Sequence, residues 1–288
     1  MKISSYSTVG LVAALTASFT PQASAGIFSN NIDMLVVAEA PNGAVSQKGR
    51  PATFAALDGG YIEAGDPIAG DTAPTPDQVS QGLRAALSIQ GFQSSMSPSV
   101  VLTYHWGVLR IDHRQVRVPY GIKTNLEARI ELVSTYQLGA EVENHILLIE
   151  KSGNMNQDAT STRIMGGPAV TVGEAARQPR IFVIVSAYDY QGLLHRDAKL
   201  LWRVKMSARE QSGEMDQVIP ALLAGGAPYF GKDLESVRTV EVTPGAVPQG
   251  QAVPAATADS LHLDNDFING LLKGEHDNFS GGSGNFNG

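Results

Sequence analysis

Two apolar segments joined by a short connection constrain the fold of this chain more than any other feature. In the first segment, Ile181–Tyr188, both alternating sets of positions are apolar or small, which is typical of an interior strand covered on both sides. In the second, Lys199–Met206, apolar residues alternate with Leu201, Arg203 and Lys205, so we expect one buried and one largely solvated face. The connection is GLLHRDAK, and the sequence therefore predicts an antiparallel hairpin.

Three polar residues at the tip of this hairpin, Asp189, His195 and Asp197, are the first candidates for chemistry. Side chains of these types bind metal ions, or act as a base with an orienting carboxylate. However, His195 lies six residues beyond Asp189, across the turn, and no Ser or Cys nucleophile motif accompanies the pair. Because hairpin tips are ordinarily polar, we interpret the three residues as structural.

A helix and a further strand are predicted upstream. In TPDQVSQGLRAALSIQGF, Thr75 and Gln78 form a capping box, Pro76 suits the first helical position, and Gly91 suits the end. The spacing of its apolar residues indicates an amphipathic helix on a sheet. The segment SVVLTYHWGVLRID alternates with period two and predicts a strand. One face of this strand carries Val100, Leu102, Tyr104, Trp106 and Val108, and the other carries Val101, Thr103, His105, Gly107 and Leu109.

His105, Asp112 and His113 form a second polar set. The strand separates His105 from Asp112 by more than about 20 Å, at roughly 3.3 Å per residue, so one strand cannot bring them together. We therefore interpret His105 as a half-buried strand residue and the Asp112–His113 pair as a polar turn.

The remaining elements are less sharply marked. Ile32–Ala40 predicts a strand, whereas YIEAGDPIAGD, from Tyr61 to Asp71, is rich in Gly and Pro and predicts an ordered loop. A helical stripe is expected at Leu126, Ile130 and Val133. Another helix is expected at Met215–Leu223, where Pro220 should kink the helix or start it afresh.

The tail, residues 241–288, is acidic and rich in Pro and Gly, which predicts disorder with a short helix around Asp266–Leu272. Its DNDFINGLLKGE segment is similar to a calcium loop, but Ile268 and Asn269 stand where an oxygen ligand and Gly are required, so we do not expect calcium binding. A second interpretation is a docking segment for a partner protein. Its anchors would be Phe267, Ile268, Leu271 and Leu272.

The first 25 residues have the layout of a secretory signal peptide, with Lys2, an apolar run and Ala23-Ser24-Ala25. No other stretch is long enough to span a bilayer, and the absence of Cys excludes disulfides and thiol chemistry. The formal net charge is −7 without a basic face, which excludes nucleic acid as a partner. We expect export to the periplasm, the outer membrane or the exterior.

Several quoted segments together resemble a known family. These are LRAALSIQGF, SPSVVLTYHWGV, RIFVIVSAYDYQGLLHRDAKLLWRVKMS and MDQVIPALLAGGAPYFG. They resemble a domain family of unknown function in bacterial envelope proteins, many of them lipoproteins, with a "PDLxVxY" strand and a later "KLxWR" strand. The chain departs from this pattern at Ser99, where the family usually has Asp, in its long insertion, and in having no lipid-anchor Cys. The resemblance implies an α+β fold and an envelope location, and it implies no catalytic residue.

The fold we expect is α+β, an antiparallel sheet packed by two or three helices. It follows a signal peptide at residues 1–25 and occupies residues 26–240, with an insertion at about 123–178 and a disordered tail at 241–288. No phosphate loop, GxSxG, HExxH or dinucleotide fingerprint occurs, so we expect no cofactor and no metal.

The expected function is that of a non-catalytic envelope protein that binds another protein or a cell-surface component. One alternative is a carboxylate-dependent hydrolase of an envelope polymer, and another is a structural subunit of an envelope assembly. Candidate binding residues lie in the Gly- and Pro-rich loop and in the tail. They are Tyr61, Glu63, Asp66, Asp71, Phe267 and Leu271.

Overall fold

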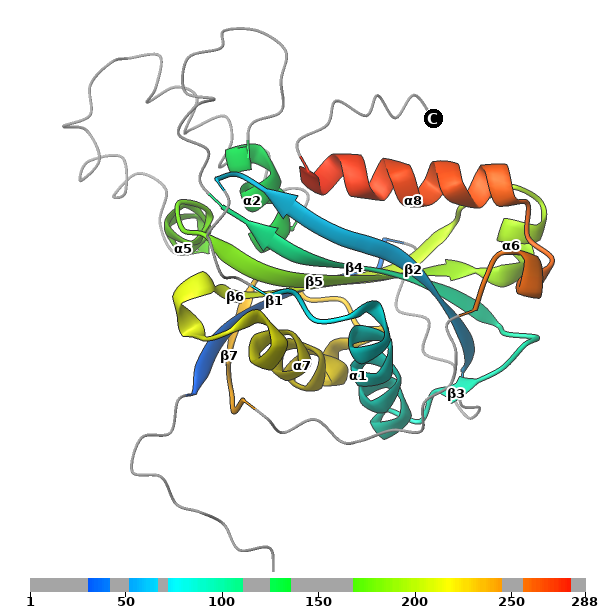
Figure 1. The fold of residues 1–288 in the computed structure, drawn as a ribbon, viewed down its shortest axis with the longest axis horizontal. Coiled ribbons are helices and arrows are strands. Elements are labelled where there is room, and N and C mark those ends of the chain that lie inside the picture. The colour runs from blue at the N-terminus through cyan, green and yellow to red at the C-terminus, as the bar shows by residue number, and fades with distance from the viewer. Residues whose placement is uncertain are drawn as a thin grey trace, which may run out of the picture.

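A seven-stranded sheet forms the centre of the part of the chain that the structure describes (Figure 1). The structure is a computed structural model, and it describes residues 31–41, 52–66, 72–110, 125–135, 168–244 and 256–280. In spatial order the strands are β3, β2, β4, β5, β6, β1 and β7. Their bounds are β1 Ile32–Glu39, β2 Thr53–Ala64, β3 Gln93–Ser94, β4 Val100–Leu109, β5 Arg180–Asp189, β6 Leu200–Arg209 and β7 Arg238–Val242.

Helices cover both faces of this sheet. One face carries α1 (Pro76–Ile89) and α7 (Met215–Gly226), which lie below the sheet in Figure 1. The other face carries α2 (Asn125–Val133), α5 (Pro168–Ala176) and α8 (Asn265–Ser280). Among the helices of the described ranges, none combines the length and the apolar character that crossing a membrane requires.

The expected α+β class is confirmed, and the sheet is mixed. From β4 to β7 in spatial order all neighbouring strands are antiparallel, as expected. At the other end, β2 runs parallel to both β4 and β3. Parallel neighbours need a crossover connection, and α1 provides it between β2 and β4.

The predicted hairpin is confirmed: β5 and β6 pair antiparallel, with Ile181 opposite Ala208 and Tyr188 opposite Leu200. The short helix α6 (Tyr190–Leu194) lies at its tip. One expectation for β6 is wrong, because the face of Arg203 and Lys205 is not solvated. The Lys205 side chain is 3% exposed and the Arg203 side chain 18% exposed, since α2 packs on this face and α8 reaches it.

The Gly- and Pro-rich region also differs from the prediction. Strand β2 runs from Thr53 to Ala64 and so includes the first residues of the expected loop, Tyr61 to Ala64. The pairing with β4 shifts register between Asp58 and Gly60. A bulge of this kind absorbs one extra residue, so the ladder to β4 continues through glycines that locally favour a turn.

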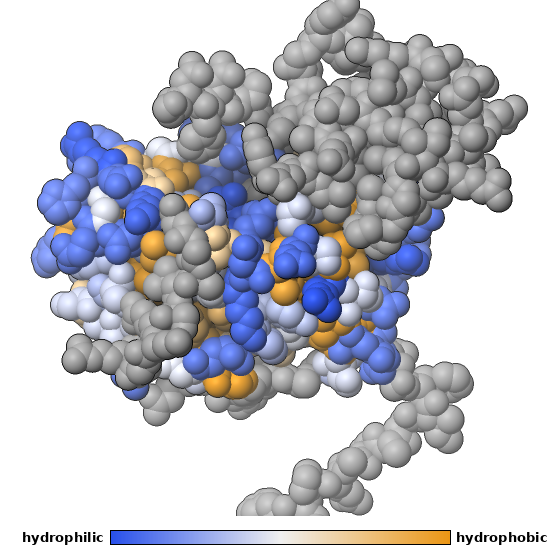
Figure 2. Space-filling model, turned by 180° about the vertical axis from the view of Figure 1, so that it is seen from behind, coloured by the Kyte–Doolittle hydropathy of each residue, from blue (hydrophilic) through white to orange (hydrophobic). Residues whose placement is uncertain are grey.

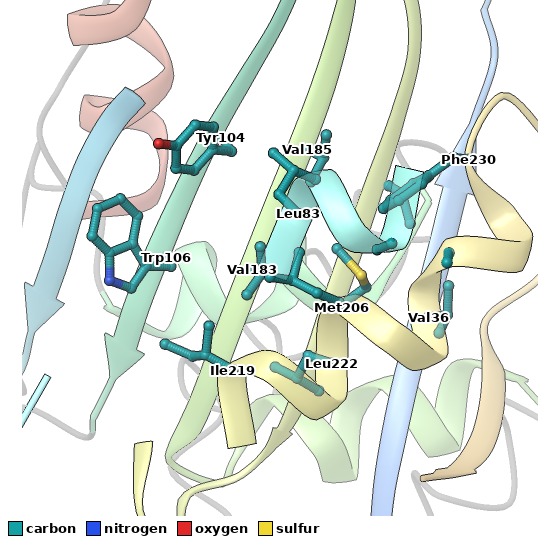
Figure 3. Packing of buried hydrophobic residues seen from close by; sticks show 14 of the residues in the cluster. Val36, Leu83, Tyr104, Trp106, Val183, Val185, Met206, Ile219, Leu222 and Phe230 are labelled. Atoms are coloured by element: carbon teal, nitrogen blue, oxygen red, sulfur yellow. The ribbon is translucent and has the colours of Figure 1, made fainter. Parts of the chain in front are cut away.

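Between the sheet and the helices α1 and α7 lies an apolar cluster (Figure 3). The capping box of Thr75 and Gln78, with Pro76 at the start, fixes the beginning of α1 as predicted. Leu83 of α1 packs in this cluster together with residues of α7, β5, β6 and β1. These include Ile219, Leu222, Val183, Val185, Met206 and Val36. Helix α7 runs through Pro220 as one element rather than starting afresh there.

Residues 256–280 form an ordered segment, whereas the sequence predicted disorder in this part of the tail. Helix α8 is longer than the short helix expected around Asp266–Leu272, and Figure 1 shows it along the upper face of the sheet. Leu261, Leu263 and Ile268 of this segment are buried against an apolar part of the sheet. The composition of the tail predicted disorder because a polar segment cannot bury enough area by itself, but here the sheet supplies the apolar partner.

Other predictions fall on residues outside the described ranges. These are the signal peptide at 1–25, the central part of the insertion, Asp71, Asp112, His113, and residues 245–255 and 281–288 of the tail. Strand β7 runs to Val242, so the sheet extends past the predicted domain end at residue 240. Within the insertion, the structure describes α2, which confirms the helical stripe of Ile130 and Val133, and α5.

We predict that Gly107→Ala destabilises the fold by about 3 kcal/mol, through steric overlap and a strained backbone. At Gly107 φ is +153°, and an added Cβ would lie 1.8 Å from the carbonyl oxygen of Ile62 on the neighbouring strand. The control is Gly173→Ala in α5, where an added Cβ has no atom within 4 Å and should stabilise the helix by about 0.5–1 kcal/mol. Urea unfolding followed by circular dichroism measures both, and equal stability of the two variants would contradict the close approach of β2 and β4.

Candidate functional site

A row of polar side chains crosses the middle of the sheet on the face covered by α2 and α8. The strand register places Thr103 of β4 opposite Ser186 of β5, Ser186 opposite Arg203 of β6, and Arg203 opposite Glu39 of β1. Arg203 Nε donates to Ser186 Oγ at 2.9 Å. Because a helix layer covers this face, these groups are withdrawn from water and need partners within the protein.

The carboxylate of Glu275 on α8 provides most of these partners. Its Oε2 accepts from Thr103 Oγ1 at 2.7 Å and from His105 Nε2 at 3.3 Å. Its Oε1 accepts from the Tyr188 hydroxyl at 2.8 Å and from Arg203 Nη2 at 3.0 Å. Each carboxylate oxygen therefore has two donors, and together they come from three adjacent strands, β4, β5 and β6.

These contacts keep the Glu275 carboxylate ionised although its side chain is only 3% exposed. Burial by itself raises the pKa of Glu275, but the hydrogen bond from His105 and the charge of Arg203 outweigh it and hold the pKa well below its usual range. Burial and the neighbouring carboxylate raise the pKa of Tyr188 above its usual range, so its phenol stays protonated and donates. The site is thus one anion held by hydrogen-bond donors.

Lys205, two residues along β6 from Arg203, binds the other helix on this face. Its Nζ donates to the carbonyl oxygens of Glu131 and Ser134 at the end of α2, both at 2.8 Å, and lies 3.4 Å from Glu39 Oε1. Burial lowers the pKa of Lys205, and the charge of Glu39 acts in the opposite direction. A cation at the last carbonyls of a helix satisfies unpaired acceptors and the helix dipole, so Lys205 caps α2.

His105 is fully buried rather than half-buried, which corrects the prediction. Its ring lies directly against Gly59 of β2, where an added Cβ would come within 2.6 Å of three ring atoms. Only a residue without a side chain leaves room for the imidazole there, which explains one glycine of the unusual β2 sequence. Among the described residues, the second ring nitrogen of His105, Nδ1, has no hydrogen-bond partner.

The polar residues at the hairpin tip have structural roles. Asp189 caps α6, since its side chain accepts from the backbone N–H of Gly192 at 2.7 Å. His195 Nδ1 lies 2.7 Å from the carbonyl oxygen of Gln191, and Asp197 is exposed. The structure therefore supports their interpretation as turn residues.

The candidate binding residues of the Gly- and Pro-rich loop are not brought together around a common centre. Tyr61 is half-buried, with its ring 6.5 Å from that of Trp106. The Glu63 carboxylate accepts from Arg110 Nη1 at 2.6 Å, in an ion pair at the end of β4. Asp66 is half-exposed. Their role in binding stays a prediction.

The two candidate residues of the tail pack against this chain itself. Leu271 is buried and Phe267 half-buried against the apolar cluster beneath α8. The backbone N–H of Phe267 donates to Asp264 Oδ1 at 2.9 Å, which caps the start of α8. Asp264 also pairs with Arg196 from the hairpin tip. In the structure, therefore, the segment that we expected to dock to a partner protein packs against the sheet of its own chain.

The polar row was not predicted from the sequence as a site. Thr103 and His105 were assigned to one face of a strand, and Arg203 to a solvated face, but no local feature pointed to Glu275. The one available signal was its spacing, because Glu275 follows Ile268 by seven residues and so lies on the same helix face as the apolar anchors.

At this site, donors from three strands bind the carboxylate of Glu275. The lone pairs of Glu275 are all engaged, and Arg203 and Tyr188 are both bound to it. Within the described ranges, no group of three or more His, Asp or Glu side chains could hold a metal ion.

Comparison with known proteins gives distant similarities only. No protein-family model matches the chain, and no curated protein matches it. Two solved PelC dodecamers from Paraburkholderia phytofirmans align with TM-scores of 0.25 and 0.26, at 11% and 10% identity, over 68% and 70% of this chain and 96% and 99% of theirs. A PDZ domain protein from Parabacteroides distasonis aligns with a TM-score of 0.38 at 10% identity, over 74% of this chain and 40% of that one. TM-scores this low establish no shared fold, assembly or function.

We predict that Glu275→Gln weakens the docking of α8 by about 3 kcal/mol, because Arg203 keeps a buried charge without a counterion and the new amide NH₂ faces hydrogen-bond donors. Hydrogen exchange of the α8 backbone amides should become faster by about a hundredfold. The control is Asp266→Asn, which removes one negative charge from an exposed position of the same helix. Unchanged exchange in Glu275→Gln would show that the ion pair does not hold α8.

We also predict that α8 docking weakens in acid. The docked state holds the pKa of Glu275 below its usual value, so it binds fewer protons than the undocked state. The stabilisation is therefore complete above about pH 5 and declines as the pH falls below about 4.3. The urea midpoints of the wild type and of Glu275→Gln, measured between pH 7 and pH 3, should converge in acid, and a constant difference would contradict the assignment.

Proposed function

We propose that this chain is a non-catalytic binding protein of the bacterial envelope. The observation that carries the proposal is the carboxylate site under α8, where four side chains from three strands converge on one anion of a helix. Convergent donors on a rigid sheet are an arrangement for recognition. Because every lone pair of the bound carboxylate is engaged, Glu275 is held as an anchor and is not available as an acid or base.

The envelope location is supported by the sequence. The layout of residues 1–25 is that of a secretory signal peptide, and the chain has no Cys. The helix and strand motifs resemble those of an envelope domain family. These features favour export, and they support a binding function in the envelope.

The surface favours selective binding over a purely structural role in an assembly. In the described part of the chain, the exposed large hydrophobic residues are Ile89, Met96 and Leu194. On the coloured part of the face turned toward the viewer, Figure 2 shows apolar areas interspersed with hydrophilic ones. A scaffold subunit would present a broad apolar patch instead.

The test is photo-crosslinking in cells combined with fractionation. A crosslinking amino acid is placed at Asp66 beside the Gly- and Pro-rich loop, at the exposed Asn269 of α8, and, as a control, at the exposed Gln217 on the opposite face. We expect a processed protein in the envelope fraction and a discrete crosslinked product from Asp66 or Asn269 but not from Gln217. An unprocessed protein in the cytoplasm, or the same products from all three positions, would refute the proposal.

A further inference from the structure

The inward face of α8 has a simple pattern. Ile268, Leu271, Leu272 and Glu275 stand at positions i, i+3, i+4 and i+7 and so lie on one side of the helix. Ile268, Leu271 and Glu275 are buried, and Leu272 is half-buried. This helix therefore presents three apolar side chains, followed by one carboxylate, to the sheet.

The sheet presents a complementary surface, which we call the α8-facing surface. Its apolar part consists of Ala55 and Leu57 of β2 and Val101 of β4. Its polar part consists of the four donors to Glu275, which are Thr103, His105, Tyr188 and Arg203. The α8-facing surface is thus an apolar stripe that ends at a group of carboxylate-binding donors. It complements an amphipathic helix that carries one acidic residue about one turn beyond its apolar residues.

We propose that the α8-facing surface is a binding site for such a helix of a partner protein, and that α8 is its resident, replaceable occupant. The proposal deepens the proposed binding function and rests on it. The partner helix has apolar residues at i, i+3 and i+4 and Glu at i+7. Arg203 and the other donors select the carboxylate, because a neutral residue there leaves a desolvated charge without a partner.

Two observations mark α8 as an imperfect occupant. First, its sequence contains Gly270 and Gly274 inside the helix, and each Gly lowers helix formation roughly threefold relative to Ala. At Gly270 an added Cβ has no atom within 4 Å, so no packing contact requires the glycine there. Second, with α8 in place, the buried Nδ1 of His105 has no partner among the described residues, so this occupant leaves one polar atom of the site unsatisfied.

A second copy of this chain is the less suitable partner. Its α8 would make the same contacts that the resident α8 already makes, and it would lose translational and rotational freedom in doing so. The tethered helix has the advantage of a high effective concentration. An untethered helix therefore displaces α8 only above this effective concentration, unless it forms a more stable helix or satisfies the site better than α8 does, which a helix of another protein can do.

The test uses the full-length protein and a synthetic peptide of residues 256–280 as the probe. Because the chain has no Cys, a single introduced thiol reports on one position. Leu271→Cys reports on release of α8, and Val101→Cys, beneath α8 on the sheet, reports on uncovering of the surface. Val183→Cys, buried on the opposite face of the sheet, reports on general unfolding. Thiol labelling rates are measured with increasing peptide.

We expect the peptide to raise the labelling rate of Leu271→Cys several-fold, because α8 leaves, while Val101→Cys stays protected under the incoming helix and Val183→Cys stays protected throughout. A peptide with Gly270→Ala should act at roughly one third of the concentration, and a peptide with Glu275→Gln should have no effect. The Glu275→Gln peptide is the matched control, since it keeps every apolar anchor.

Each of several results would overturn the proposal. The first is unchanged labelling of Leu271→Cys with both the wild-type and the Gly270→Ala peptide. The second is an effect of the Glu275→Gln peptide equal to that of the wild-type peptide, or general unfolding seen as labelling of Val183→Cys. The third is a dimer of the full-length protein on size-exclusion chromatography that Glu275→Gln abolishes, which would make a second copy the occupant. A crosslinked product at Asp66 in cells would still support the general binding function in each case.

Discussion

The structure depends on how one face of the sheet accommodates two cations of β6, in addition to the buried Arg180 of β5. Arg203 and Lys205 project from β6 toward a helix layer that withdraws them from water, and charges in that position need compensation. Each cation holds a different helix. Lys205 caps the carbonyl end of α2, and Arg203 binds the carboxylate of Glu275 on α8. Alternate residues of a single strand thus fix the positions of two helices.

The two faces of the sheet are closed by different physical means. On the face of α1 and α7, aliphatic and aromatic side chains form most of the contact, with Arg84 of α1 buried near Tyr104, and the hydrophobic effect holds the layers together. On the opposite face, apolar contacts surround a polar centre whose geometry is set by hydrogen bonds. Apolar packing tolerates substitution by another apolar side chain of similar shape, whereas binding of a carboxylate requires a negative charge at one position. The second face is therefore the more selective of the two, which is why we place recognition there.

Much of the fold was predictable from local signals in the sequence. The alternation in β4, β5 and β6 assigned the strands and their faces, because side chains point to opposite sides of a strand with period two. The capping box at Thr75 and Gln78 fixed the start of α1, because all its groups lie within four residues. The glycines of β2 misled the prediction, since the ring of His105 and the pairing with β4, rather than a turn, account for them.

The sequence by itself determined the hairpin, the amphipathic helix and the absence of thiol chemistry, all of which depend on residues close together in the chain or on composition alone. Tertiary structure decided that the polar residues of β6 are buried and that the tail forms α8. It also decided that Glu275 contacts Arg203, 72 residues away in the sequence, and His105, 170 residues away. The physical reason is that an isolated strand with Arg and Lys on one side has a solvated face, and only a second layer turns those residues into a site. Which distant segment forms that layer depends on complementarity of shape and charge in three dimensions, which no local pattern encodes.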